Sequence, residues 1–114
     1  MQDVFHPLGD TFVVAAATTA PAGIQVLPTA QNDKVYPDHY RIFNPGDETV
    51  YVGYGKDATE AQANAVAPIA GTEQKCIPVP ASSVEVIKLG EGVWLSGLTV
   101  TNSVSLFVTV GKGV

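Results

Sequence analysis

The stretch HYRIFNPGDETVYVGYG, residues 39–55, decides the fold class of this chain. Apolar side chains recur at every second position in both of its halves, and the residues NPGDE lie between the halves. Alternation with a period of two is typical of a β-strand that is buried on one face. The stretch therefore predicts two strands, His39 to Asn44 and Thr49 to Tyr54, joined by a turn.

The turn itself is indicated by Pro45 and Gly46. Proline presets the backbone at the first central position of a type II turn, and glycine accepts the positive φ that the second position requires. We therefore expect a hairpin, in which the two flanking strands pair with each other.

The same pattern of short strands continues on both sides of this stretch. Eleven glycines and eight prolines interrupt the chain, and strands at intervals of roughly 8–12 residues are typical of sandwiches and barrels. Further strands are predicted at Asp10 to Thr18, Ile24 to Pro28, Gln74 to Val79, Val84 to Leu89, Val93 to Leu98, and Val104 to Val110. The prediction is an all-β fold: an antiparallel, jelly-roll-like β-sandwich of about eight strands. Residues 10–114 form this single domain, and residues 1–9 form an N-terminal arm.

The last predicted strand, within SVSLFVTV at residues 103–110, shows which side chains should face outward. Four aliphatic residues alternate with Ser105, Phe107 and Thr109. Successive side chains of a strand point to opposite faces, so these three are expected on the face opposite the core.

One short helix is predicted at about residues 57–66. Asp57 is its expected N-cap, and Glu60 stands three positions later, as in a capping box. The residues between are mostly alanine, and Pro68 ends the helix. Because its apolar face is shallow, we expect the helix to lie at one end of the sandwich rather than in a core layer.

The loop before this helix resembles a nucleotide-binding motif. Gly53, Gly55 and Ala58 match the loose dinucleotide fingerprint, and Glu73 follows at a distance suited to a ribose-binding acid. That fingerprint requires a parallel βαβ unit, however, and the segment after the helix, APIAGTE, contains proline and glycine and is not a central parallel strand. We therefore interpret the glycines as structural, giving the backbone room to leave a strand and enter a helix.

Composition excludes several classes of partner. The net charge is −5 and no basic cluster is present, so nucleic acid is not an expected partner. The apolar runs are shorter than the ~20 residues of a membrane span, so no membrane partner is expected either. Only 15% of the residues are charged, against about 25% in an average domain. The surface is therefore either covered by partners or built from Ser, Thr and Ala.

Residues able to carry chemistry are few and scattered. His6 and His39 are the only histidines and Cys76 is the only cysteine, and their spacing is not that of metal ligands. Cys76 is expected in the core, as is Trp94, although Trp94 could instead stack on a sugar. We predict no catalytic, cofactor-binding or metal-binding residue, no cofactor and no enzymatic activity. With one cysteine and no signal peptide in view, maturation in a cytoplasm is expected.

The predicted arm carries three apolar side chains, Val4, Phe5 and Leu8. Apolar residues on an arm gain stability only when they are buried. They either fold back on the domain or dock on a neighbouring subunit, and we take them as the candidate partner-binding residues.

Three runs of the sequence resemble small virion proteins of tailed phages and prophages, and most closely the cement or decoration proteins of the outer capsid surface. They are FHPLGDTFVVAAATTAPAGIQV, YRIFNPGDETVYVGYGKDATEAQANAVAP and SGLTVTNSVSLFVTVGKGV, which together cover most of the chain. The family has no active site to map onto this sequence.

The resemblance implies a structural virion protein that binds the major capsid protein. It would be made in the cytoplasm of the host bacterium, sit on the outer capsid surface and stabilise the mature shell by bridging capsid subunits. Self-association as a dimer or trimer is also expected. The alternative is a binding module of a phage tail or fibre, which would meet carbohydrate or another virion protein through Tyr36, Tyr51, Tyr54 and Trp94.

Overall fold

The computed structural model describes residues 6–25, 39–89 and 93–112, and everything stated below about the structure refers to these residues. Eight strands and one helix follow one another along the chain, as the sequence predicts. They are β1 (His6–Ala16), β2 (Ile24–Gln25), β3 (His39–Asn44), β4 (Val50–Gly55), α1 (Ala58–Asn64), β5 (Cys76–Val79), β6 (Ser83–Lys88), β7 (Trp94–Leu98) and β8 (Val104–Lys112).

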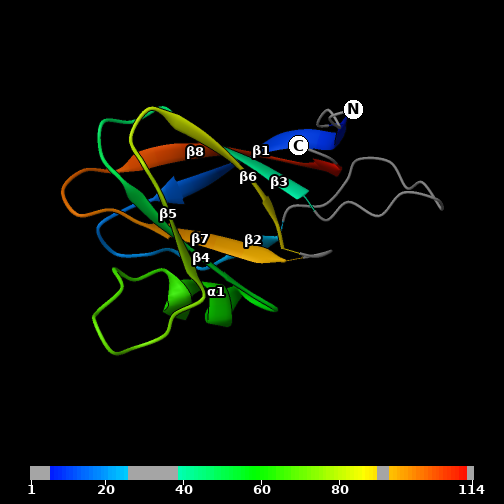
Figure 1. The fold of residues 1–114 in the computed structure, drawn as a ribbon. Coiled ribbons are helices and arrows are strands. Elements are labelled where there is room, and N and C mark those ends of the chain that lie inside the picture. The colour runs from blue at the N-terminus through cyan, green and yellow to red at the C-terminus, as the bar shows by residue number, and fades with distance from the viewer. Residues whose placement is uncertain (1–5, 26–38, 90–92, 113–114) are drawn as a thin grey trace.

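The strands form two four-stranded sheets packed face to face (Figure 1). Sheet A has the strand order β1-β8-β3-β6 and sheet B has the order β2-β7-β4-β5. All the paired strands are antiparallel. This is the strand order of an eight-stranded jelly roll, so the predicted antiparallel sandwich is confirmed.

The predicted hairpin at residues 39–55 is wrong, although both of its strands exist. Strand β3 pairs with β6 and β8 in sheet A, and β4 pairs with β5 and β7 in sheet B. Gly46 is not in the left-handed region, since the only glycine with positive φ in the described segments is Gly71. The connection crosses between sheets because alternation identifies a half-buried strand without identifying its partner.

A buried asparagine braces this crossing. The Asn44 side-chain amide donates to the backbone carbonyls of Glu48 at 2.9 Å, Val79 at 3.0 Å and Pro80 at 3.2 Å. Its carbonyl oxygen accepts from the Gly46 amide at 2.9 Å. These bonds join the β3–β4 connection to the end of β5, and they satisfy polar groups that would be costly to bury alone.

The core lies between the sheets and follows the predicted alternation. Tyr40 and Ile42 of β3 are fully buried, and Leu106 and Val108 of β8 lie against them in the same cluster. The other buried members are Val14, Ala16, Val50, Val52, Val79, Leu95, Val104 and Val110. The predicted inward and outward faces of β3, β4 and β8 are therefore confirmed.

The predicted helix is confirmed with its cap, but its predicted location is wrong. Asp57 is the N-cap and its carboxylate accepts from the Glu60 amide at 2.7 Å. Helix α1 lies on the outer face of sheet B, against β4 and β7, and not at an end of the sandwich (Figure 1). A β-carbon at Gly53 would lie 2.2 Å from the Ala65 amide nitrogen, so the bare backbone of Gly53 is what allows the helix to approach the sheet.

The N-terminal strand is longer than predicted at its start. β1 begins at His6 rather than at Asp10, and His6 and Pro7 pair with the last residues of β8. The pairing register then shifts between Pro7 and Thr11. Leu8 of the predicted arm thus lies in β1, while Val4 and Phe5 lie outside the described residues, as does the end of the predicted second strand.

Candidate functional site

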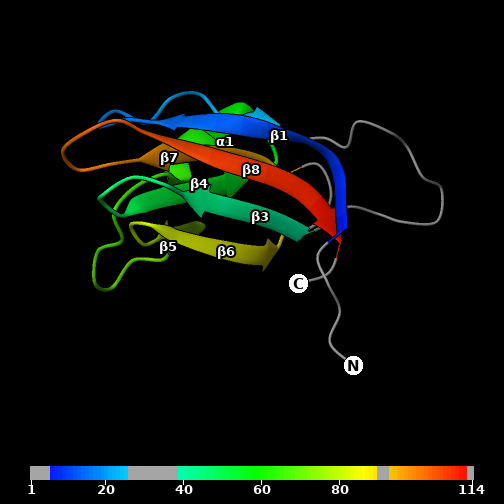
Figure 2. The same cartoon turned by 90° about the horizontal axis from the view of Figure 1, so that it is seen from above.

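The two outer faces of the sandwich differ in what covers them. Helix α1 packs on the outer face of sheet B. The outer face of sheet A carries no helix or other described element, and its four strands lie in full view in Figure 2. This face, which no described element covers, is the candidate interaction surface.

Four apolar side chains form a line across this face, which we call the apolar row. The strand register places Val13 opposite Phe107, Phe107 opposite Phe43, and Phe43 opposite Val84. The row therefore crosses all four strands, β1, β8, β3 and β6. Val13 is 49% exposed, Val84 41% and Phe107 38%.

The middle of the apolar row is held by two stacked aromatic rings. The centroids of Phe43 and Phe107 are 6.3 Å apart, with an angle of 26° between the ring planes. Such a pair contributes about 0.5–1.5 kcal/mol beyond the area it buries. The ring pair therefore fixes the centre of the face, where Phe107 stays 38% exposed and Phe43 is half-buried.

A second line, polar except for one valine, runs beside the apolar row. Thr11, Thr109, Arg41 and Val86 are neighbours in the strand register. The hydroxyls of Thr11 and Thr109 are 2.7 Å apart and hydrogen-bonded. Arg41 is exposed. The face thus combines an apolar centre with a flanking cation, which suits binding of a protein surface rather than a covalent reaction.

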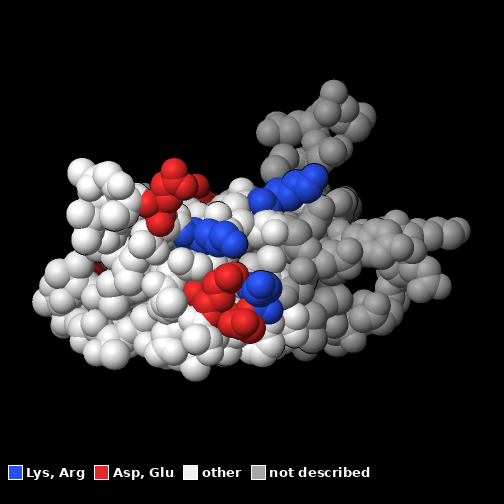
Figure 3. All heavy atoms as spheres, turned by 90° about the horizontal axis from the view of Figure 1, so that it is seen from below, with Lys and Arg blue, Asp and Glu red and all other residues white. Residues whose placement is uncertain are grey.

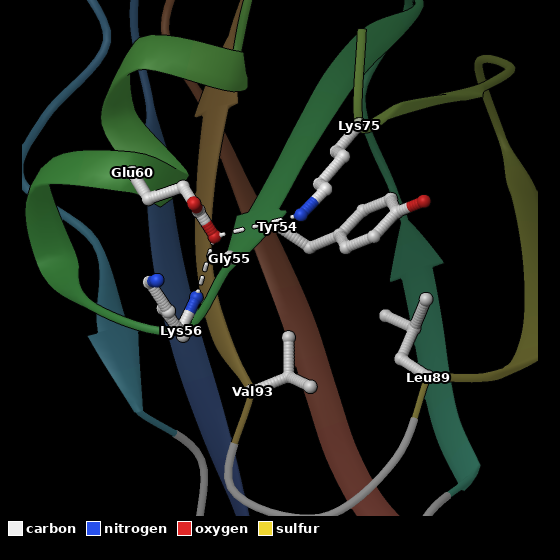
Figure 4. A pocket seen from close by; sticks show the side chains of 7 residues that line it. All are labelled: Tyr54, Gly55, Lys56, Glu60, Lys75, Leu89 and Val93. Atoms are coloured by element: carbon white, nitrogen blue, oxygen red, sulfur yellow. Dashed lines mark hydrogen bonds and ion pairs between the residues drawn. The ribbon is translucent and has the colours of Figure 1, made fainter.

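The glycine loop lies beside an open hollow of about 330 Å³ (Figure 4). Glu60 Oε1 accepts from the Lys56 amide at 2.9 Å and lies 3.9 Å from Lys75 Nζ. A β-carbon at Gly55 would lie 2.6 Å from Glu60 Cγ. The Glu60 carboxylate therefore hydrogen-bonds the backbone just before α1. Position 55 is glycine because a side chain there would collide with Glu60.

Pairing around the helix also differs from that of a dinucleotide site. The strands before and after α1 pair directly and antiparallel, with Gly53 opposite Cys76. A dinucleotide fingerprint needs a parallel βαβ unit at this place. The structural interpretation of the two glycines is therefore the one that the geometry supports.

The α1 side of the molecule carries charges of both signs close together (Figure 3). Lys75 and Glu60 form the described ion pair, and the Lys75 side chain is 61% exposed. A pair this open contributes at most about 1 kcal/mol. On this side, charges of both signs therefore partly compensate each other.

The two histidines lie in one sheet and the cysteine lies in the other. His6 and His39 pair with neighbouring residues at the end of β8, Lys112 and Gly111, whereas Cys76 lies in sheet B. Within the described residues, no three His, Cys, Asp or Glu side chains gather closely enough to hold a metal ion.

Cys76 is half-buried rather than part of the core, so its predicted core position is wrong. Its thiol donates to the Val66 carbonyl, with 3.2 Å between sulfur and oxygen. Desolvation raises the pKa of the Cys76 thiol, which makes it a poorer nucleophile. The misplacement arises because β5 is an edge strand, with exposed Pro78 beside the cysteine.

The aromatic residues of the alternative carbohydrate hypothesis do not share one face. Tyr54 packs against the core, opposite Leu95. Tyr51 and Trp94 point outward from sheet B, at opposite ends of β4. Trp94 is half-buried and outside the core cluster, so its predicted core position is wrong, and Tyr36 lies outside the described residues.

The apolar row is the feature that sequence reasoning missed as a site. Each member stands at an outward position of a predicted strand, so large apolar residues at polar-face positions were the available signal. Their alignment depends on the register of four strands that are distant in the chain.

Comparisons with protein-family models, curated proteins and solved structures gave no match to this chain. In the described part of the chain, none of the helical structure is of a length and apolarity that would cross a membrane.

Proposed function

We propose that this protein is a structural virion component that binds the outer surface of a phage capsid and stabilises the mature shell by bridging capsid subunits. The observation that carries the proposal is the apolar row on the uncovered face of sheet A. The resemblance of the sequence to capsid cement proteins supports the same function.

The apolar row is suited to holding a protein partner. Contiguous apolar surface of this kind marks interaction sites on folded proteins. Covering it gains about 25 cal/mol for each Å² of apolar surface removed from water. Because the row is built on paired strands and a stacked ring pair, little ordering cost arises on binding.

The proposed mechanism is linkage between binding and the state of the shell. A protein that binds only the expanded shell stabilises that state over the precursor. Many copies, each spanning a junction between subunits, add their binding free energies. We further propose that the copies self-associate as dimers or trimers, with the major capsid protein as the other partner.

Shell binding tests the proposal directly. The purified protein is mixed with precursor shells and with expanded shells of the phage whose genome carries this chain, and co-sedimentation is measured. We expect saturable binding to expanded shells, weak binding to precursor shells, and a higher disruption temperature for the decorated shells. Failure to bind expanded shells would refute the proposed function.

Copy number and a glycan array separate this function from the tail or fibre alternative. A shell component is present in many copies per particle, and a tail component in few. Specific glycan binding together with a low copy number would favour the carbohydrate-binding module instead.

A further inference from the structure

Three of the four edge strands of the sandwich have features that oppose pairing with another chain. The edges are β1 and β6 in sheet A, and β2 and β5 in sheet B. Strand β2 has two residues, and β5 has four, including Pro78, which has no backbone N–H. Strand β6 carries Glu85 on its inward side, opposite buried Ile42. Short length, proline and inward charge are the means by which natural sheets avoid further pairing.

Strand β1 lacks these features in its second half. Among the described strands it is hydrogen-bonded to β8 alone, and it forms the edge of sheet A in Figure 2. Its register with β8 is unbroken from Thr11 to Ala16. This stretch, TFVVAA, contains no charged residue, proline or glycine. The free backbone groups of such an edge are a template for another strand, and short uncharged segments of this composition pair readily.

The sequence of this edge suits pairing with a second copy of itself. A two-fold axis normal to the sheet pairs a strand antiparallel with its own copy and presents the same residues on both sides. With the axis at Val13, Val13 stands opposite the partner's Val13, and Thr11 stands opposite the partner's Ala15. Asp10, just before the stretch, stands opposite the partner's Ala16. No two like charges are therefore directly opposite each other, an arrangement that would be destabilising.

The same pairing would extend both the apolar row and the core. Val13 is the β1 end of the apolar row and is 49% exposed, so the rows of the two copies would meet at the axis. Phe12 is half-buried at the margin of the core, and it would stand opposite the partner's Val14. Self-pairing at β6 would instead place Glu85 of each copy on the inward side of the joined sheets. Charge and apolar contact thus both favour β1.

We propose that the free edge of β1 pairs antiparallel with the β1 edge of a second copy, about a two-fold axis at Val13. The two copies of sheet A would then form one continuous sheet. This deepens the proposed function, on whose self-association it rests, by naming the surface and its symmetry. Because the axis is normal to the sheet, the dimer would present both apolar rows on one side, as a protein that spans a junction requires.

Sedimentation of the full chain at increasing concentration tests the pairing with two matched variants. Val13→Lys places a cation on each side of the axis, whereas Val84→Lys places it at the other end of the apolar row, on β6. Both side chains are exposed and lie outside the core. We expect the wild type and Val84→Lys to dimerise alike. Val13→Lys should dimerise about tenfold more weakly or less, because like charges would face each other.

Oxidative crosslinking tests the position of the axis independently. Directly opposite residues of an antiparallel pair have Cα atoms about 4.5–5.5 Å apart, within the range of a disulfide. Val13→Cys should therefore give a covalent dimer. The two sulfurs of Ala15→Cys would belong to strand positions about 14 Å apart, too far for a bond. Cys76 is present in both variants, so a crosslink through Cys76 would appear in both.

The outcomes separate this proposal from the capsid function. A wild type that stays monomeric at every concentration would overturn the proposal, as would equal weakening by Val13→Lys and Val84→Lys. Failure of Val13→Cys to crosslink more than Ala15→Cys would overturn it as well. If hydrogen exchange shows extra protection of the β1 amides only on expanded shells, a capsid strand occupies the edge and the second copy is wrong. A β1 dimer that binds no shell would refute the capsid function alone.

Discussion

The carboxylate of Glu48 accepts a 2.8 Å hydrogen bond from the backbone amide of Asn102, a residue 54 positions later in the chain. It also accepts from the amides of Val100 at 2.9 Å and Thr101 at 3.0 Å. Glu48 belongs to the connection from β3 to β4, and the three amides belong to the connection from β7 to β8. One side chain thus joins two crossings between the sheets.

Replacing Glu48 by Gln is expected to destabilise the protein in a pH-dependent way. The hydrogen bonds from Thr101, Asn102 and Val100 lower the pKa of Glu48. A carboxyl group whose pKa is lower in the folded protein than in the unfolded chain stabilises the folded state at pH values above its unfolded-state pKa. This stabilisation is lost as the pH falls through the pKa of the folded state. The difference between wild type and Glu48→Gln should therefore be present at neutral pH and shrink below about pH 4.

Urea unfolding at neutral and acidic pH measures this difference, and Glu73→Gln, at an exposed position, is the control. A difference that does not change with pH would show that the three amide bonds do not act through the charge of Glu48.

Introducing a carboxylate at Asn44 is expected to give a penalty that depends on pH. Asn44→Ala leaves buried carbonyls without a donor and should cost about 1–3 kcal/mol. Asn44→Asp should cost more at neutral pH, because a carboxylate would face the carbonyls of Val79 and Pro80. Burial raises the pKa of such a group, so the penalty should decrease as the pH falls. Chemical unfolding across this pH range provides the measurement.

Gln74→Glu, at an exposed position, is the matched control for Asn44→Asp, because it also replaces an amide by a carboxylate. Equal effects of Asn44→Asp and Gln74→Glu at neutral pH would contradict a bracing role for Asn44.

Gly53→Ala is expected to displace the end of α1 from sheet B. The added β-carbon would lie 2.2 Å from the Ala65 nitrogen and 2.5 Å from the Ala61 oxygen, and both are backbone atoms with little freedom to move. Overpacking of this kind costs about 1–3 kcal/mol or more. Hydrogen exchange should show lower protection of the α1 amides, together with a lower unfolding midpoint.

Gly71→Ala is the comparison for Gly53→Ala. Gly71 has a φ of +88° and no atom within 4 Å of an added β-carbon. Gly71→Ala should lower the free energy of unfolding by about 1–2 kcal/mol, the cost of placing a non-glycine residue in the left-handed conformation. The α1 amides should keep their protection from hydrogen exchange. Unchanged protection of α1 in Gly53→Ala would show that the close approach is not needed.

Truncation distinguishes the predicted arm from the strand that follows it. Removing residues 1–5 leaves all of β1 and should give a folded protein, whereas removing residues 1–9 also removes His6 and Pro7, which pair with β8. If Val4 and Phe5 dock on a neighbouring subunit, the shorter truncation should weaken binding to expanded shells. Normal binding by the folded truncated protein would rule out a docking role for these two residues.

The candidate site illustrates what could and could not be predicted from local patterns. The outward positions of Phe107 and Phe43 follow from alternation within their own strands. Their stacking, and their alignment with Val13 and Val84, depend on pairing between strands far apart in the chain. No short-range pattern contains that register, so the row became visible only in the folded sheet.

The sequence by itself determined where the strands lie, which side chains of β3, β4 and β8 face inward, and where α1 begins. Those features depend on side-chain alternation and on a cap such as Asp57, which act over a few residues. Only the tertiary structure decided that β3 and β4 belong to different sheets, that α1 covers sheet B, and that no described element covers the outer face of sheet A. These features depend on packing between different elements, such as the contact of Gly53 with the end of α1. A local sequence pattern does not specify which elements pack together.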